Sequence, residues 1–354
     1  MAKMISYPLF QNLLLLFLLR TGFLLVECKI PAIIVFGDST VDTGNNNMIK
    51  TLLKSNFKPY GKDFEGGQPT GRFSNGRIPP DFISERFGLK KTVPAYLDPK
   101  FGIQDFATGV VFASAGTGFD NVTASVLNVI PFWKEIEMYK EYQKRLRDYQ
   151  GEYKANETLS EALYIVSIGT NDFLENYYLL PTTRAHFTVQ QFEDHLLGIA
   201  RKFIEDIYQL GARKIALTGL PPMGCLPLER TINIMALSQC NEEYNNVALE
   251  YNAKLSRLIA QLNKELAGLK LVFSNPYYLL LHMIKKPSFY GFEVTWKACC
   301  GTGLVEMSYL CEIDNLLTCR DADKYIFWDS FHPTEKTNRI AANYIVDKVL
   351  YKFM

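Results

Sequence analysis

The sequence predicts an α/β protein built around a mostly parallel, five-stranded sheet. Five short runs rich in apolar residues occur along the chain, and none of them alternates between apolar and polar positions. Continuous apolar runs are typical of strands buried on both faces of a parallel sheet. Helical or loop segments separate the runs, as in a sandwich in which helices cover a sheet. The expected strands are Ala32–Phe36, Val110–Ala113, Leu163–Ile168, Lys214–Leu220 and Leu269–Phe273.

The clearest helix is expected between the third and fourth runs. Apolar residues recur there every three or four positions, which gives a helix one apolar face. They are Val189, Phe192, Leu196, Ile199, Phe203 and Ile207. Gly211 ends this pattern, as a left-handed C-terminal cap does. Further helical patterns cover residues 235–266 and 333–351.

Residues 29–354 are expected to form a single domain, because no internal repeat, low-complexity linker or clean boundary interrupts them. The loop Lys54–Pro80 is long but contains Tyr60, Phe64 and Phe73, so we expect it to pack over one end of the sheet. The net charge is +1, from 38 basic and 37 acidic residues. This balance argues against a nucleic acid or an anionic membrane as a partner.

Residues 1–28 differ in composition from the rest of the chain. Lys3 gives a positive start, and Leu13–Leu19 form an apolar core that precedes a cleavage point after Cys28. Arg20 and Glu27 interrupt the apolar run, which is too short for a good membrane span. We predict a cleaved secretory signal, with a retained N-terminal anchor as the alternative. After cleavage, no integral membrane segment is expected.

Two N-glycosylation sequons fit an exported chain. They are Asn121-Val-Thr123 and Asn156-Glu-Thr158. Such triplets also arise by chance, so each of them alone is a weak signal. Asn121 and Asn156 are the expected glycosylation sites.

The cysteine pattern also fits export. Six cysteines follow residue 28, and an even number in an exported chain suggests disulfides. They are Cys225, Cys240, Cys299, Cys300, Cys311 and Cys319. Cys225 and Cys240 would close a local loop, while the adjacent Cys299 and Cys300 would each pair with Cys311 or Cys319, in either combination. The alternative, a zinc site, needs paired C-x-x-C motifs that are absent, so no metal is expected.

Polar groups follow several of the expected strands, at the edge where parallel sheets bind ligands. Gly37-Asp38-Ser39 follows the first run, Ala113–Gly118 ("ASAGTG") follows the second, and Gly169–Asp172 ("GTND") follows the third. Together they offer a hydroxyl, glycine-lined backbone N–H groups and a carboxamide. After Ser39, the side chains of Asp42, Asn45 and Asn46 are expected to stabilise the turn and the start of the next helix through bonds to the backbone. A base is missing from this set.

His332 is the best candidate for the missing base among only four histidines. His186 and His195 have acidic neighbours and are interpreted as surface residues, and His282 is interpreted as a packed helix position. His332 instead follows Asp329 by three residues and precedes Pro333, which favours the first turn of a helix. A carboxylate three residues back can orient the imidazole and leave its other nitrogen for a hydroxyl.

These residues are the parts of an acyl-transfer site. Ser39 is the expected nucleophile, His332 the general base and then acid, and Asp329 the orienting carboxylate. The backbone N–H groups of Ser39 and Gly116 and the side-chain amide of Asn171 would meet the oxyanion. The G-x-S-x-G elbow of another class of serine hydrolases is absent.

The chain resembles the GDSL-type (SGNH) esterase/lipase family in its large secreted plant branch. The likeness spans nearly the whole mature chain. It rests on seven ordered blocks: "FGDSTVDTGNNN", "GRFSNGR", "FASAGTG", "SIGTND", "GLPPMGC", "ACCGTG" and "FWDSFHPT". The resemblance implies a three-layer α/β/α fold and hydrolysis of carboxylic esters. It also implies a Ser–Asp–His relay that uses neither a metal nor an organic cofactor.

Carried over by position, the family's nucleophile falls on Ser39, and its relay pair falls on Asp329 and His332. Its oxyanion glycine falls on Gly116, with Gly109 as a weaker candidate, and its asparagine donor falls on Asn171. The sequence departs from the family pattern at Thr40, where the namesake motif has Leu, and at Val111, where Asn is frequent. Neither departure removes a catalytic atom.

The leading hypothesis is a secreted serine hydrolase that cleaves acyl or lipid esters through an acyl-enzyme intermediate. One alternative is an acyltransferase that uses the same site with a sugar or lipid hydroxyl as acceptor. The other is a cell-wall binding protein without catalytic activity. The expected location is extracellular, in the cell wall or apoplast, and the expected partner is a small-molecule, lipid or polysaccharide ester.

Overall fold

The computed structural model describes residues 30–233, 239–311 and 316–353. Residues 30–353 group into one compact unit. The expected signal peptide, residues 1–28, lies outside the described residues. No helix of the described part of the chain is long and apolar enough to cross a membrane.

The five expected strands form one sheet, and every neighbouring pair in it is parallel. The strand order is β2-β1-β3-β4-β5. Each strand lies within one or two residues of its predicted bounds, so the predicted fold class is confirmed. The strands are β1 (Ile33–Gly37), β2 (Gly109–Val111), β3 (Leu163–Ser167), β4 (Lys214–Thr218) and β5 (Lys270–Ser274).

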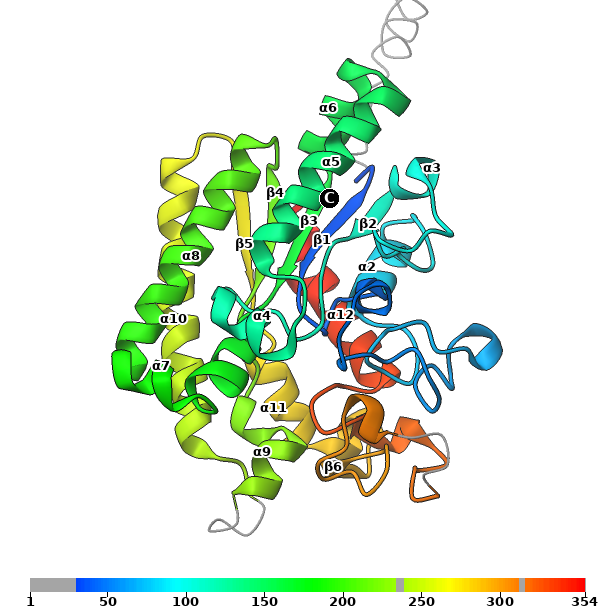
Figure 1. Ribbon diagram of the computed structural model, residues 1–354, viewed down its shortest axis with the longest axis vertical. Helices are drawn as coiled ribbons and strands as arrows, with labels where there is room; N and C mark the ends of the chain where they lie inside the picture. The colour runs from blue at the N-terminus through cyan, green and yellow to red at the C-terminus, as the bar shows by residue number, and fades with distance from the viewer. Residues whose placement is uncertain (1–29, 234–238, 312–315, 354) are drawn as a thin grey trace, which may run out of the picture. The chain divides into compact units, whose positions relative to one another are not determined.

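Helices cover both faces of this sheet and make three layers (Figure 1). One face packs against α5 (Phe132–Gln150), α8 (Val189–Gln209) and α10 (Glu242–Glu265). The other face packs against α2 (Pro79–Arg86) and α12 (Glu335–Lys348). Alternate strand residues point to opposite layers, so both faces are apolar, as the continuous runs predicted.

The remaining helices cluster around the edges of this sandwich. The helices α3, α4 and α6 precede β3 in the chain. The helices α7, α9 and α11 lie toward the carboxyl ends of the strands (Figure 1). Their bounds are α3 (Ile103–Phe106), α4 (Asn121–Leu127), α6 (Glu152–Glu161), α7 (Pro181–His186), α9 (Pro227–Ile232) and α11 (Tyr277–Lys285).

Two helices begin later than the sequence pattern indicated. Asn241 caps α10 by accepting from the N–H groups of Glu243 and Tyr244, so the helix begins after it. The earlier part of that prediction, residues 235–238, lies outside the described residues. Pro333 is not in the first turn of α12, because Thr334 is the N-cap and accepts from the N–H of Thr337.

Two strands were not predicted, and one histidine was placed wrongly. β6 (Val294–Ala298) and β7 (Tyr325–Phe327) form a separate parallel pair. His282 lies exposed on α11, where its Nδ1 is 2.8 Å from the Tyr290 hydroxyl, and is not a packed position.

All six expected cysteines form disulfides. The predicted local pair, Cys225–Cys240, is confirmed. Of the two open combinations, the chain has Cys299–Cys319 and Cys300–Cys311. No cluster of three or more metal-binding side chains occurs among residues that the structure describes.

Candidate active site

Ser39, His332 and Asp329 lie in one hydrogen-bonded row at the carboxyl edge of the sheet. The Ser39 Oγ is 2.7 Å from the Nε2 of His332. The Nδ1 of His332 is 2.8 Å and 2.9 Å from the two Asp329 carboxylate oxygens. Only 7% of Ser39 and 4% of His332 are exposed, and Asp329 is fully buried. The three predicted side chains therefore meet in a site largely screened from solvent.

The end of β1 holds Ser39 in a tight polar turn. The Asp38 carbonyl accepts from the N–H groups of Val41 and Asp42, which turns the chain back. The Asp38 carboxylate accepts from both the N–H and the hydroxyl of Thr40. Burial raises the pKa of Asp38 above its ordinary value. Thr40, the departure from the family pattern, thus bonds Asp38 in the turn and lies within hydrogen-bond distance of the Ser167 hydroxyl.

Asp42, Asn45 and Asn46 support the turn through backbone contacts. One Asp42 oxygen accepts from the N–H groups of Gly44 and Asn45 at 2.7 and 2.8 Å, which starts the short helix that follows, as predicted. The Asn45 and Asn46 amides donate instead to carbonyls on the second polar segment, at Ala113 and Ala115. These asparagines therefore join the turn after Ser39 to the segment that carries Gly116.

The expected oxyanion donors lie around this turn. Gly116 has a φ of +84°, a backbone conformation that residues with a side chain rarely adopt, so the position favours glycine. The Asn171 amide donates to the Thr117 carbonyl at 2.9 Å, which leaves its second hydrogen free for another acceptor. Within the described residues, the backbone N–H groups of Ser39 and Gly116 have no hydrogen-bond acceptor. The weaker candidate Gly109 pairs with Ile33 at the opposite end of the sheet.

Two buried carboxyl groups that the sequence analysis did not select hold these segments. Glu135 of α5 accepts from the Gly37 N–H at 2.9 Å, directly before Asp38. Asp172 accepts from the N–H groups of Phe119 and Asp120 and from the Thr123 hydroxyl. Burial raises the pKa of Glu135 well above its ordinary value and that of Asp172 to about 7. The sequence could have indicated that Glu135 is buried, because it is a carboxyl group on the largely apolar face of its helix.

Tyr60 is a further contact of the relay that sequence reasoning missed. Its hydroxyl donates to Asp329 Oδ2 at 2.6 Å and accepts from the Ser308 N–H at 2.9 Å. The ring is fully buried and packs edge-on against Phe73 and Trp328. The sequence indicated only that this loop is packed, because the partner of Tyr60 lies far along the chain.

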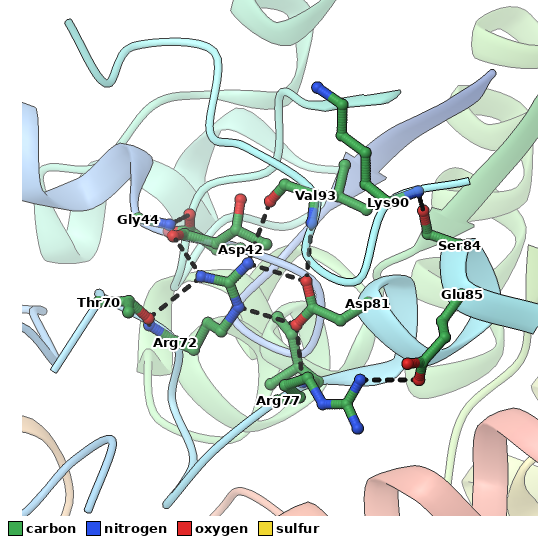
Figure 2. Close-up of polar contacts among 12 residues, drawn as sticks. Asp42, Gly44, Thr70, Arg72, Arg77, Asp81, Ser84, Glu85, Lys90 and Val93 are labelled. Atoms are coloured by element: carbon green, nitrogen blue, oxygen red, sulfur yellow. Dashed lines mark hydrogen bonds and ion pairs between the residues drawn. The ribbon is translucent and has the colours of Figure 1, made fainter. Parts of the chain in front are cut away.

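Two regions rich in loops flank the site. We call them the first loop region (residues 38–93) and the cystine region (the described residues 294–311 and 316–334). In the first loop region, Arg72 forms a two-point ion pair with Asp81 at 2.8 Å (Figure 2). Arg72 also donates to the Thr43 carbonyl. Arg72 belongs to the "GRFSNGR" block. The next residue, Phe73, packs against the ring of His332, with 4.9 Å between the two ring centroids. That block therefore contacts both the segment that follows Ser39, at Thr43, and the ring of His332.

An all-parallel five-stranded sheet between two helical layers is the three-layer fold of the SGNH hydrolases. Comparison with known proteins agrees. The sequence model of the GDSL-like lipase/acylhydrolase family matches residues 33–345. The chain belongs to this family, and membership places it among the carboxylic ester hydrolases.

Relatives in one plant cover nearly the whole chain. A GDSL esterase/lipase of Arabidopsis thaliana is 60% identical over 348 residues, which are 97% of this chain and 99% of the relative. Two others from the same plant are 57% and 56% identical and cover 94% and 92% of this chain and 95% and 93% of their own length. The resemblance to the plant branch of the family is thereby confirmed.

Proposed function

We propose that the chain is a secreted serine hydrolase that cleaves acyl esters with Ser39 as nucleophile. The observation that carries this proposal is the 2.7 Å contact between the Ser39 Oγ and His332 Nε2. A hydroxyl is a weak nucleophile until a base takes its proton. The contacts of Nδ1 with Asp329 fix the ring so that Nε2 faces the hydroxyl.

The reaction follows from these contacts. The Ser39 Oγ attacks the ester carbonyl carbon as its proton passes to His332 Nε2. The bond from carbon to the alcohol oxygen then breaks, and His332 returns the proton to the leaving alcohol. Water attacks the acyl-enzyme and gives a proton to His332, which passes it to the Ser39 Oγ as the carboxylic acid leaves.

Charge on the carbonyl oxygen is met by the Ser39 and Gly116 N–H groups and the Asn171 amide. Donors that are already in place need no rearrangement when the charge develops. Because Asn171 is one of three such donors, Asn171→Ala should lower kcat by about 100- to 1,000-fold.

Replacement of the nucleophile tests the proposal. Ser39→Ala should abolish hydrolysis of p-nitrophenyl acetate and labelling by a fluorophosphonate probe, with unchanged far-UV circular dichroism. Ser330→Ala is the matched control, because Ser330 is buried beside Asp329 and its hydroxyl has no partner among the described residues. Retained turnover in Ser39→Ala would refute the site. Absence of labelling in the unmodified protein would favour a binding protein without activity.

We also propose export, cleavage after Cys28 and glycosylation at Asn121 and Asn156. Three disulfides fit an extracellular protein, and both asparagines are exposed. Expression in plant cells should give a medium-borne protein that begins at Lys29. Peptide N-glycosidase should lower its mass in two steps, one of which disappears in Asn121→Gln and the other in Asn156→Gln. A cell-retained product with an intact N-terminus would contradict the export proposal.

A further inference from the structure

A cavity of about 160 Å³ adjoins the candidate nucleophile. Ser39, Asn171 and His332 line one part of it. The remainder lies against the sheet face that packs on α12, with α11 as another wall. The cavity therefore leads from the reacting hydroxyl toward the interior of the sandwich.

The sheet forms a floor that changes from polar to apolar with depth. Ser167, Thr218 and Ser274 are in register with Gly37 at the strand ends, and all three line the cavity. Two residues deeper, Ile165 and Ala216 line it from the same face. Alternate residues of a strand point to one face, so this change lies along a single path. The methyl group of Ala216 leaves room that a larger side chain would fill.

Two helices make mostly apolar walls over this floor. Leu279 and Met283 of α11 line the cavity from one side. Thr337, Ala341 and Ile345 of α12 line it at four-residue intervals, which is one face of that helix. From Thr337 to Ile345 the helix rises about 12 Å, so the lined path extends well beyond Ser39.

We propose that this cavity binds the acyl chain of the ester, as an unbranched chain of about six to ten carbons. The proposal rests on the hydrolase function of Ser39. An apolar cavity of roughly 150 Å³ can hold a six-carbon ring, which sets the lower limit. A path of about 12 Å corresponds to about ten bonds of an extended chain, at about 1.2 Å a bond, which sets the upper limit.

The acyl half fits the cavity better than the alcohol half does. In the second half of the reaction, water must take the place that the alcohol has left. An apolar cavity stays dry, so water would not refill it if the alcohol had occupied it. An alcohol bound on the solvent side leaves a place that water enters at once, while the acyl chain stays in the cavity, attached to Ser39.

A matched pair of substitutions on α11 tests this assignment. Leu279 lines the cavity, whereas Leu281 on the same helix is also partly buried but does not line it. The unmodified protein should gain about fourfold in kcat/KM with each methylene up to six to ten carbons in p-nitrophenyl esters. Leu279→Trp should move the optimum to four carbons or fewer, whereas Leu281→Trp should keep the original profile.

Ala341→Leu, a smaller change on the opposite wall, should shorten the optimum in the same direction if Leu279→Trp folds poorly. The assignment is overturned by a flat chain-length profile or by the same profile in both tryptophan variants. It is also overturned if Leu279→Trp alters a series of acetate esters with lengthening alcohols and not the acyl series. Acetate hydrolysis that survives Ser39→Ala would refute the hydrolase site itself. Ser39-dependent hydrolysis without chain-length preference would refute only the acyl cavity.

Discussion

The first loop region and the cystine region both hold the candidate site with little regular secondary structure, but different interactions stabilise them. In the first loop region, buried charges bind the backbone: Arg72 pairs with Asp81, and Asp42 accepts from three N–H groups. In the cystine region, two disulfides close loops of 20 and 11 residues. The first region should therefore respond to pH and charge, and the second should respond to reductant.

The largest effect is expected from breaking the buried ion pair. Arg72→Met should lower the free energy of unfolding by about 3–5 kcal/mol, because Asp81 would stay fully buried without its counter-charge. Denaturant unfolding measures this loss. Arg86→Met is the control, because its pair with Asp347 is exposed and worth less than about 1 kcal/mol. Equal losses in the two variants would show that burial does not set the strength of the Arg72 pair.

Removal of one disulfide of the cystine region should have the next largest effect. Cys299→Ala/Cys319→Ala should lower the free energy of unfolding by about 3 kcal/mol, as expected for a 20-residue closure. Reductant should therefore destabilise the unmodified protein more than this variant. Reductant should not change the loss of unfolding free energy that Arg72→Met causes, because the free-energy effects of changes at distant sites are additive. A change in the Arg72→Met effect under reductant would mean that the two regions are not braced separately.

What the sequence could predict depended on how local each signal was. The sheet was predictable because each strand is a continuous apolar run, and the relay pair was predictable because Asp329 and His332 are three residues apart. The strands β6 and β7 escaped prediction because 26 residues separate them, β7 is only three residues long and most side chains of β6 are not fully buried.

Parts of the candidate site depend on contacts between distant segments. Tyr60 meets Asp329 across 269 positions, and Glu135 meets Gly37 across 98. The cavity next to Ser39 depends on the small volume of Ala216 and on how α11 and α12 pack. A single sequence does not carry such pairings in its periodicity, so residue roles were predictable from motifs while their supports were not.

The pH dependence of stability should distinguish the two regions. Burial raises the pKa of Asp42 from 3.8 to about 6, so the folded chain holds this proton more tightly than the unfolded chain does. The contribution of Asp42 is therefore fully present below about pH 4 and is lost as pH rises through about 6. Asp42→Asn should flatten this decrease in the free energy of unfolding, measured by denaturant titration from pH 4 to 7.

Neighbouring Asp38 and Glu135 are also buried carboxyl groups with raised pKa values. The free energy of unfolding of Asp42→Asn should therefore still decrease with pH, but less steeply than that of the unmodified protein. The disulfide variant Cys299→Ala/Cys319→Ala is the control, because a disulfide does not titrate and its loss should leave the slope unchanged. An unchanged slope in Asp42→Asn, or a flattened one in the disulfide variant, would contradict the assignment of pH sensitivity to the first loop region.

The smallest effect is expected where the two regions meet, at Tyr60. This residue belongs to the first loop region but bonds to Asp329 and Ser308 of the cystine region. Tyr60→Phe keeps the packed ring and removes the hydroxyl. We expect kcat to fall about tenfold with little change in KM, since a hydrogen bond to a charged group is worth about 1.5–3 kcal/mol and tenfold corresponds to about 1.4.

Tyr142→Phe separates this positioning role from a general loss of stability. Tyr142 is also fully buried, but its hydroxyl donates to the Phe106 carbonyl, away from the relay. Tyr142→Phe should lower the free energy of unfolding without lowering kcat, whereas Tyr60→Phe should lower both. If kcat is unchanged in Tyr60→Phe, the cystine region holds Asp329 without help, and the two regions support the site independently. If kcat falls as expected, the orientation of Asp329 depends on a side chain from the charge-stabilised region. A rise in pH that weakens the first loop region and a reductant that weakens the cystine region can then each disturb the same carboxylate.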